Sequence, residues 1–473
     1  MKPRPARRIC ENSRSVGVRA HAKANGLTCK TSSCWVKPYR RASGLSRKAS
    51  RRQLLAMRFL FVHQNFPGQF GHVAAALAQQ GHEVVAVGEA RRLEARPSPH
   101  VGILRVGYDT PAAASPGAHP NLRKFEADVR RGEVVARLAT DLHRRGLRPD
   151  VVVAHPGWGE TLFLKDVFSQ SRHLHYCEYF YRAQGGDVGF DPEFPAHTHD
   201  QWRQRVLNST QLIGMEYADG GYSPTAWQAS RYPAGIRERL QVIHDGINTE
   251  LVRPNAQAVL QVGQRSLTAA DQVVTYVARN LEPYRGFHVF MRALPELLSR
   301  CPRAQVVIVG GDEKGYGARA PDGKTWREVY WEPVRGKLDA SRVHFLGHVP
   351  YATYLQVLQV SSAHVYLTYP FVLSWSMLEA MAAGCLVIGS ATPPVQEVLQ
   401  HEENGLLCDF FKVDQWVDSI ERALVQRQAM APLRQKARQT VVANFDLKTV
   451  CLPRHLAMLG VTPSAPRING QNE

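Results

Sequence analysis

The sequence of 473 residues is long enough for two or three domains, and 44% hydrophobic with 21% charged residues is typical of a globular protein. Its formal net charge of +18 is uneven: residues 1–56 carry 15 Lys and Arg and a single acid, which leaves 44 basic and 40 acidic residues, or +4, on the remainder. This mild charge does not support a fold-wide affinity for polyanions such as nucleic acids. No apolar run approaches the ~20 residues of a membrane span, and no signal-peptide core is present.

Residues 1–56 are rich in Arg, Lys and Ser and show no periodicity, so they cannot bury enough apolar surface to fold. We interpret them as a disordered leader ahead of a natural start at Met57. An organellar transit peptide and a basic arm that contacts nucleic acid are the alternatives. Five of the eight cysteines are scattered beyond the leader without a metal-type C-x-x-C spacing, which favours reduced, structural thiols in a cytosolic protein.

From Met57 onward, short apolar strands alternate with helical segments, the pattern of a doubly wound parallel sheet. In the first half, strands are expected at 59–62, 84–87, 102–106, 150–154, 174–177, 220–223 and 241–244, and helices at 72–80, 121–145 and 200–217. This pattern predicts one Rossmann-like domain over residues 57–252.

Three loops of this half carry candidate ligand contacts. Gly68 and Gly71 would let the backbone approach a ligand, but they do not form G-x-G-x-x-G, which disfavours a dinucleotide. His155 and Glu160 lie on a Gly-rich loop at the end of a strand, which is typical of a polar ligand site; the alternative for His155 is a bond within its own loop. The irregular stretch 178–199 is a candidate substrate loop, to which we assign no metal.

Residues 253–270 are interpreted as a connection to a second series of strands and helices. Strands are expected there at 273–277, 305–309, 343–346, 363–367, 386–388 and 406–408, and helices at 287–300, from Pro350 to 358, after Ser374 or Ser376, near 394–399 and within 413–444. A second Rossmann-like domain is therefore predicted over residues 253–445, with a tail at 446–473.

Two features of this second half suit a diphosphate. Arg279 and Arg285 flank one loop at the end of a strand, where two guanidinium groups can hold a diphosphate by charge-assisted bonds. A helix that starts at Ser374 presents free N–H groups to an anion at the edge of the sheet where ligands bind. The alternatives are two solvated arginines and an ordinary helix with an exposed Glu379.

Four stretches of the second half resemble, in order, the donor domain of the retaining glycosyltransferases of family 4, which have the GT-B fold. They are Ala278–Gly286 (the Arg…Lys-Gly diphosphate loop, with Arg285 for Lys), Gly347–Val349 (the loop whose backbone reads the base), Tyr369–Gly389 (the Glu-x7-Glu helix) and Pro393–Leu407 (the stretch after it). In the first half, the Gly68–Gly71 loop, His155 and Asp245–Ile247 resemble acceptor-domain features more loosely. The resemblance implies an α/β protein with two Rossmann-like doubly wound domains facing across a cleft.

The resemblance also implies an activity. It implies retaining, metal-independent transfer of a hexosyl group from a nucleoside-diphosphate sugar to a glycan, lipid-linked or small-molecule acceptor, with no other cofactor. The implied catalytic residues are His155, Arg279 and Arg285; the donor contacts are Gly68, Gly71, Val349, Ser374 and Glu379; the acceptor contact is Glu160; and no residue binds a metal. A cytoplasmic location is expected, with peripheral contact with the inner face of the membrane as an open alternative. Nucleic acid is not an expected partner, and the oligomeric state is left open.

The chain departs from the family at the first carboxylate of the Glu-x7-Glu pair, which falls at Phe371. Phenylalanine cannot bond a sugar hydroxyl, so Ser374 or backbone N–H groups would have to take over part of that contact. The departure keeps alternatives open: a catalytically degenerate nucleotide-sugar binding protein, or another GT-B enzyme such as an epimerase or a phosphorylase.

Overall fold

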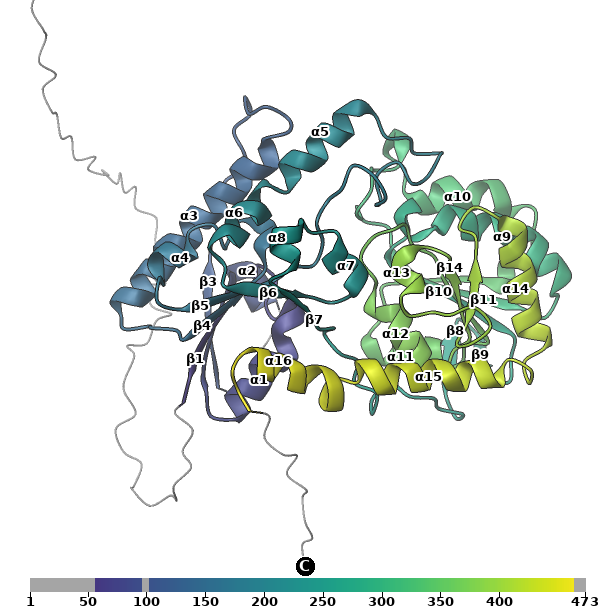
Figure 1. Ribbon diagram of the computed structural model, residues 1–473. Helices are drawn as coiled ribbons and strands as arrows, with labels where there is room; N and C mark the ends of the chain where they lie inside the picture. Colours follow the sequence, from purple (N-terminus) through teal and green to yellow (C-terminus); the bar gives the residue numbers. More distant parts are fainter. Residues whose placement is uncertain (1–55, 96–101, 463–473) are drawn as a thin grey trace, which may run out of the picture. The chain divides into compact units, whose positions relative to one another are not determined.

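The computed structural model describes residues 56–95 and 102–462, so the predicted leader and the last part of the predicted tail lie outside the described residues. Two parallel sheets form the fold (Figure 1). The first, in the order β3-β2-β1-β4-β5-β6-β7, consists of β1 (Arg58–Val62), β2 (Glu83–Glu89), β3 (Ile103–Tyr108), β4 (Val151–Ala154), β5 (Arg172–Tyr176), β6 (Gly220–Ser223) and β7 (Leu240–Val242). The second, in the order β12-β11-β10-β13-β14-β15, consists of β10 (Val273–Asn280), β11 (Gln305–Gly311), β12 (Val343–Gly347), β13 (Ala363–Tyr366), β14 (Val387–Ser390) and β15 (Leu406–Cys408).

Both strand orders confirm the predicted doubly wound α/β fold. The central strands are short apolar runs buried along almost their whole length, as expected where helices cover both faces of a parallel sheet. In each sheet the chain reverses its direction of growth once, between β1 and β4 and between β10 and β13. Ligands of such sheets bind outside the carboxyl ends of the strands at that reversal, so the loops after these four strands are where a site is expected.

The expected helices are present, one of them divided, and the first half has further short helices that were not predicted. They are α1 (Gly71–Gln79), α2 (Ala90–Glu94), α3 (Arg123–Arg144), α4 (Leu164–Val167), α5 (Thr198–Leu207), α6 (Ser209–Tyr217), α7 (Ala226–Ser230), α8 (Ala234–Arg237), α9 (Phe287–Arg300), α10 (Trp326–Arg335), α11 (Tyr351–Gln359), α12 (Trp375–Ala382), α13 (Pro393–Gln396), α14 (Val413–Val425), α15 (Ala431–Phe445) and α16 (Leu452–Met458). The helix predicted over 200–217 is divided into α5 and α6 at Asn208, whose side-chain amide bonds the backbone N–H and C=O of Tyr181.

Residues 253–270, predicted as a plain connection, contain an antiparallel hairpin of β8 (Val259–Val262) and β9 (Arg265–Thr268). Leu260, Val262 and Leu267 are buried and join an apolar cluster that includes Val273 of the second sheet. The alternating burial along β8 is the period-two signal of a half-buried strand. The prediction missed this hairpin because the burial of its apolar residues depends on partners elsewhere in the chain, such as Val307 and Val357.

The segment expected to be a tail instead returns to the first sheet. A π-helical turn (Leu447–Cys451) follows α15, and α16 then packs beside α1, as the yellow and purple helices of Figure 1 show. Leu456 and Leu459 lie in the same buried cluster as Phe59 and Leu77 of the first half. The end of the described chain is therefore part of the core of the first half.

Candidate active site

Helix α12 begins next to the end of β13 with Ser374 as its N-cap. The Ser374 hydroxyl accepts a bond from the N–H of Ser376 (3.3 Å), as expected for a cap, and its own N–H donates to the Tyr366 hydroxyl (2.9 Å). The backbone N–H groups of residues 371–373, just ahead of the cap, make no hydrogen bond to any described residue. The loop and the helix end thus offer free donors to an anion or a hydroxyl group.

Glu379 lies one turn into α12, and both of its carboxylate oxygens are hydrogen-bonded. The Tyr351 hydroxyl donates to one oxygen (2.6 Å) and the Tyr354 hydroxyl to the other (2.7 Å). Tyr354 is buried, whereas Tyr351 is 48% exposed. Of the two donors, the exposed Tyr351 hydroxyl is therefore the one that a ligand hydroxyl can displace from Glu379.

Arg279 is near the end of β10, and Arg285 lies on the turn that follows this strand. Arg279 is exposed, whereas Arg285 is only 8% exposed. Arg285 donates from Nη1 to the Thr368 hydroxyl (2.8 Å) and the Val372 carbonyl (3.2 Å), which fixes its guanidinium against the loop that leads to α12. Gly286 follows in the left-handed region (φ 65°), where a Cβ would collide with Leu367. The tight turn therefore holds Arg285 beside the free N–H groups of the α12 loop.

Phe371, which stands at the position of the missing carboxylate, packs in an aromatic cluster. Its ring lies 4.7 Å from that of Tyr179, 4.8 Å from that of Tyr316 and 5.7 Å from that of Tyr284. The guanidinium carbon of Arg285 lies 5.9 Å from the Phe371 ring, within cation–π range. Apolar contacts thus stand where the family has an acidic side chain. A sugar bound here would therefore have one carboxylate fewer to accept hydrogen bonds from its hydroxyl groups.

In the first half, His155 follows β4 and is 5% exposed. Its ring stacks on Trp158 with the centroids 3.8 Å apart, its Nδ1 accepts from the N–H of Gly157 (3.0 Å), and its Nε2 lies 3.4 Å from a carboxylate oxygen of Glu178. Burial raises the pKa of Glu178, but the hydrogen bonds from His155 and Gln69 and the charge of Arg279 outweigh it and hold that pKa below its usual value. Groups from both halves thus lower the pKa of the Glu178 carboxylate.

Two further groups of contacts join the halves near these residues. Trp375 of α12 donates to the buried carboxylate of Asp245 (2.8 Å), and burial raises the pKa of Asp245 to about 7. The 187–194 segment, part of the predicted substrate loop, bonds the second half through three acids. These contacts are Asp187 with the Tyr284 hydroxyl (2.8 Å), Asp191 with the Tyr369 hydroxyl (2.6 Å) and with His288 (2.9 Å), and Glu193 with Arg292 (2.8 Å).

Comparison with known proteins decides the family. The sequence profile described as "Glycosyl transferase family 4 group" matches residues 80–252, and the profile described as "Glycosyl transferases group 1" matches residues 263–440. The chain is a family 4 glycosyltransferase. Both halves of the GT-B fold are covered by these matches, one by each profile.

Relatives of this glycosyltransferase are distant. A D-inositol 3-phosphate glycosyltransferase of Mycobacteroides abscessus is 26% identical over 40% of the chain and 40% of its own length. A GDP-mannose-dependent alpha-(1-6)-phosphatidylinositol monomannoside mannosyltransferase of Mycobacterium tuberculosis is 25% identical over 48% of the chain and 58% of its own length. The chain thus matches roughly half the length of these curated relatives.

Solved structures agree on the fold. A sucrose-phosphate synthase of Thermosynechococcus elongatus superposes with a TM-score of 0.64 at 20% identity, covering 85% of this chain and 98% of that one. The Anabaena protein HepE, solved in complex with UDP and glucose, gives 0.59 at 16% identity, covering 85% of this chain and 99% of that one. At these identities the similarity concerns the fold.

One of the predicted site residues of this glycosyltransferase, Glu160, needs correction. Glu160 was expected to contact an acceptor, but it is 1% exposed and accepts a bond from the Tyr108 hydroxyl inside the first half. Gly159 before it turns the chain inward with a φ of 99°. Burial raises the pKa of Glu160, so this side chain lies in the interior rather than at an acceptor surface.

The two glycines of the first loop differ. Gly68 has a φ of 47°, and a Cβ there would lie 2.7 Å from the ring of His63, so this position requires glycine. Gly71 is the first residue of α1 with helical torsions and needs no special conformation. Val349 is half-buried between two apolar clusters, on the loop after β12. Of these three predicted donor contacts, only Gly68 has a backbone conformation that requires glycine.

Three side chains of the 187–194 contacts could in principle hold a metal ion, because one ligand atom each of Asp191, Glu193 and His288 lies within 4.8 Å of the others. However, Arg292 binds both oxygens of Glu193, and Tyr369 and His288 contact the same oxygen of Asp191. A cation competes poorly with a guanidinium already bound. We therefore interpret this cluster as a polar contact between the halves, with Asp191 and His288 buried and Glu193 exposed.

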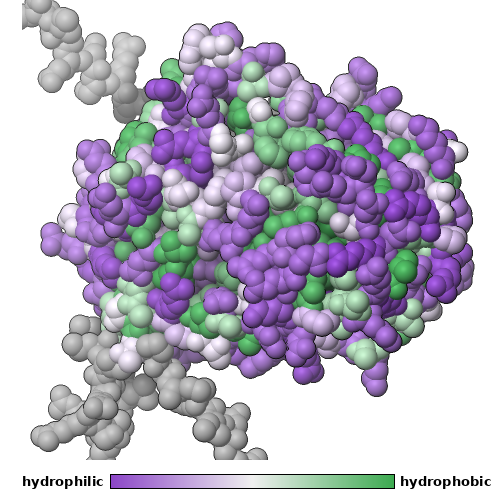
Figure 2. Space-filling model, turned by 45° about the vertical axis from the view of Figure 1, so that its right-hand side comes forward, coloured by the Kyte–Doolittle hydropathy of each residue, from purple (hydrophilic) through white to green (hydrophobic). Residues whose placement is uncertain are grey.

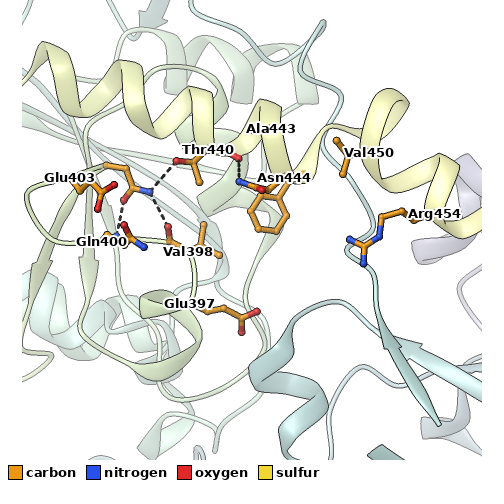
Figure 3. Close-up of a pocket in the computed structure, with 11 residues that line it drawn as sticks. Glu397, Val398, Gln400, Glu403, Thr440, Ala443, Asn444, Val450 and Arg454 are labelled. Atoms are coloured by element: carbon orange, nitrogen blue, oxygen red, sulfur yellow. Dashed lines mark hydrogen bonds between the residues drawn. The ribbon is translucent and has the colours of Figure 1, made fainter. Parts of the chain in front are cut away.

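A polar pocket of about 490 Å³ lies away from these residues, where α13, α15 and the π-helical turn meet (Figure 3). Glu397 at its edge accepts from the N–H groups of Ala226 and Trp227 (2.7 Å each), which caps α7 of the first half. The pocket's side-chain amides bond backbone groups, as the dashed lines of Figure 3 show: Asn404 accepts from the N–H of Gln400 and donates to the Val398 carbonyl, and Asn444 donates to the Thr440 carbonyl. The residues that resemble the family stretch 393–407 thus contribute here to the contact between the halves.

Among the residues described, no helix is long and apolar enough to cross a membrane. On the face shown in Figure 2, hydrophobic side chains occur in small groups among hydrophilic ones.

Proposed function

We propose that this glycosyltransferase moves a hexosyl group from a nucleoside-diphosphate sugar to a hydroxyl group of a carbohydrate, lipid-linked or small polyol acceptor, with retention of the anomeric configuration. The observation that carries the proposal is the convergence of Arg285 with the free N–H groups of residues 371–373 and the N-terminus of α12. Fixed donors of this kind stabilise the charge of a departing diphosphate. Arg279, exposed near the end of β10, would add a second guanidinium.

The nucleoside would lie beyond the diphosphate, along α12. Glu379 would accept from the ribose hydroxyls, and the backbone around Val349 would contact the base, as the family resemblance implies. Similar proteins include one solved with UDP and glucose, a GDP-mannose-dependent mannosyltransferase and a D-inositol 3-phosphate glycosyltransferase, which supports a nucleotide-sugar donor and a polyol acceptor.

The reaction balances without a protein nucleophile. The bond between the anomeric carbon and the diphosphate oxygen breaks, and its electron pair leaves with the diphosphate. The acceptor oxygen forms the new bond on the same face of the sugar, and its proton passes to a diphosphate oxygen. His155 would orient the reacting sugar or the acceptor hydroxyl.

The proposal is tested by incubating the chain with UDP-glucose, UDP-N-acetylglucosamine, GDP-mannose and ADP-glucose, each with and without D-inositol 3-phosphate or a disaccharide. Release of one nucleoside diphosphate, together with an α-linked product by NMR, is the expected result. Phe371 motivates a second candidate, a binding protein without turnover. Tight binding of one donor with no release of nucleotide would favour that candidate, and a β-linked product would contradict retention.

Removing the Tyr351 hydroxyl group tests where the nucleoside binds. In the unliganded chain, Tyr351 competes with a ribose hydroxyl for Glu379, so Tyr351→Phe is expected to tighten nucleoside-diphosphate binding about fivefold, on the scale of one hydrogen bond. Tyr354→Phe, which leaves the competing hydroxyl in place, serves as the matched variant and is expected to bind no more tightly than the unaltered chain. Calorimetry gives both constants. Weaker binding by Tyr351→Phe would place the ribose elsewhere.

A further inference from the structure

Glu178 is the point where two hydrogen-bond chains of the first half end. It lies just beyond β5, and its side chain is 32% exposed. Glu178 is the first residue of the predicted substrate loop 178–199, but it belongs to no motif and was given no role of its own. Its two oxygens are bonded separately, one by Gln69 and the other by His155.

The first chain starts at a backbone donor and runs through three side chains. The N–H of Asn65 donates to Nδ1 of His63 (2.9 Å), so the proton of the neutral ring lies on Nε2. That Nε2 lies 3.0 Å from Oε1 of Gln69, which orients the amide so that its NH₂ group donates to Glu178 (3.1 Å). Every hydrogen bond in this chain is therefore donated in the same direction, and the last donor, the Gln69 NH₂ group, points at the Glu178 carboxylate.

The second chain is shorter and has the same direction. The N–H of Gly157 donates to Nδ1 of His155, which leaves the ring proton on Nε2, facing Glu178. Because both chains present donors, Glu178 must be the acceptor at both oxygens, and that favours its charged form. The residue after Glu178, Tyr179, packs on Phe371 of the second half with the ring centroids 4.7 Å apart, so Glu178 adjoins the loop that leads to α12. The charge of Arg279 also contributes to the lowered pKa of Glu178.

We propose that the Glu178 carboxylate supplies the negative charge that stabilises the positive charge developing at the anomeric carbon, and that Gln69 and His155 are positioning residues for it. The inference rests on the proposed function, because it needs a donor whose diphosphate is held by Arg279. No bond forms to Glu178: the electron pair still leaves with the diphosphate, and the new bond is made by the acceptor oxygen.

The geometry favours this role over a purely structural one. If Glu178 only held the side chains of His155 and Gln69 in place, it would need just two acceptor positions. Glu178 instead keeps a third of its side-chain surface exposed, and the charge of the exposed Arg279 of the other half lowers its pKa. A fixed charge matters most where charge develops during the reaction, since the enzyme environment need not reorganise.

The test replaces Glu178 by glutamine, which keeps its size and removes its charge. UDP-glucose and GDP-mannose are the probes, with donor turnover and calorimetric binding measured on the full chain. Glu178→Gln is expected to lower kcat about a hundredfold while the donor Kd changes less than about threefold. Gln69→Leu is expected to lower kcat about tenfold in the same manner. Glu216→Gln, at an exposed glutamate of α6, is the control and leaves both constants unchanged.

Each other outcome overturns the inference. If Glu178→Gln keeps its kcat within about threefold, or loses kcat and donor binding in equal proportion, Glu178 has no selective effect on the reaction step. Should Glu178→Gln fail to fold by circular dichroism, Gln69→Leu decides, and an unchanged kcat for that variant overturns the inference. If the unaltered chain neither binds nor turns over either probe, the proposed function fails, and the inference fails with it.

Discussion

Replacing Arg285 by methionine is expected to lower kcat/KM for nucleotide-sugar turnover about a thousandfold, the scale of losing a fixed charge at a developing anion. Arg285 is nearly buried and bonds both Thr368 and the Val372 carbonyl. Methionine fills much of the volume but removes the charge and these bonds. The loop that carries the free N–H groups of residues 371–373 would lose its anchor as well, so the diphosphate would lose both kinds of donor.

The comparison needs two controls. Arg303→Met alters an exposed arginine after α9 in the same half and is expected to leave turnover unchanged. Arg285→Lys keeps the charge but not the planar fork, and it should recover part of the loss, since the family resemblance places a lysine there. Steady-state kinetics of the three variants gives the values. Full activity in Arg285→Met would place the diphosphate elsewhere.

Asp191→Ala is expected to lower the free energy of unfolding by about 3–5 kcal/mol, the range for breaking a buried charged contact. Asp191 is 1% exposed and contacts His288, which is fully buried, and the Tyr369 hydroxyl. Alanine leaves both partners in the interior without the carboxylate. Urea unfolding followed by circular dichroism measures the change. Asp166→Ala, at an exposed position of α4, is the control, with an expected effect below about 0.5 kcal/mol.

The contribution of Asp191 should depend on pH in one direction. Burial raises its pKa, but the bonds from His288, Tyr369 and the N–H of Glu193 outweigh this and lower the pKa below its ordinary value of 3.8. A carboxyl group with a lowered folded pKa adds stability above its unfolded pKa and loses it as the pH falls through the folded value. The difference between Asp191→Ala and the unaltered chain should therefore be full at pH 6 and shrink below pH 3.8. A difference that grows on acidification would contradict the assignment.

The sequence predicted the sheets because each strand is an apolar run between turn residues, and that signal is local. Arg279, Arg285 and Ser374 could be placed at strand ends and a helix end for the same reason. The hairpin at 259–268 and the return of α16 were missed, since their burial depends on partners that lie far away in the chain, such as Phe59 for Leu456.

The acceptor side was harder to predict for a physical reason. Glu160 is near His155 in the sequence, yet the left-handed Gly159 turns it into the interior. Glu178 has no motif, and it gains its partners only because β1, β4 and β5 lie side by side and bring Gln69 and His155 to the same edge. Proximity across strands, rather than along the chain, decides which polar side chains meet.

Calorimetric titration of the full chain with UDP, GDP and ADP, repeated with Arg279→Ala and Glu379→Ala, tests most directly whether the second half holds a nucleoside diphosphate. Binding of one nucleotide in preference to the others, weakened at least about tenfold in both variants, is the predicted result, because each variant removes a charge-assisted contact. No binding of any of the three, or equal binding by the unaltered chain and both variants, would contradict a donor site built on Arg279 and α12.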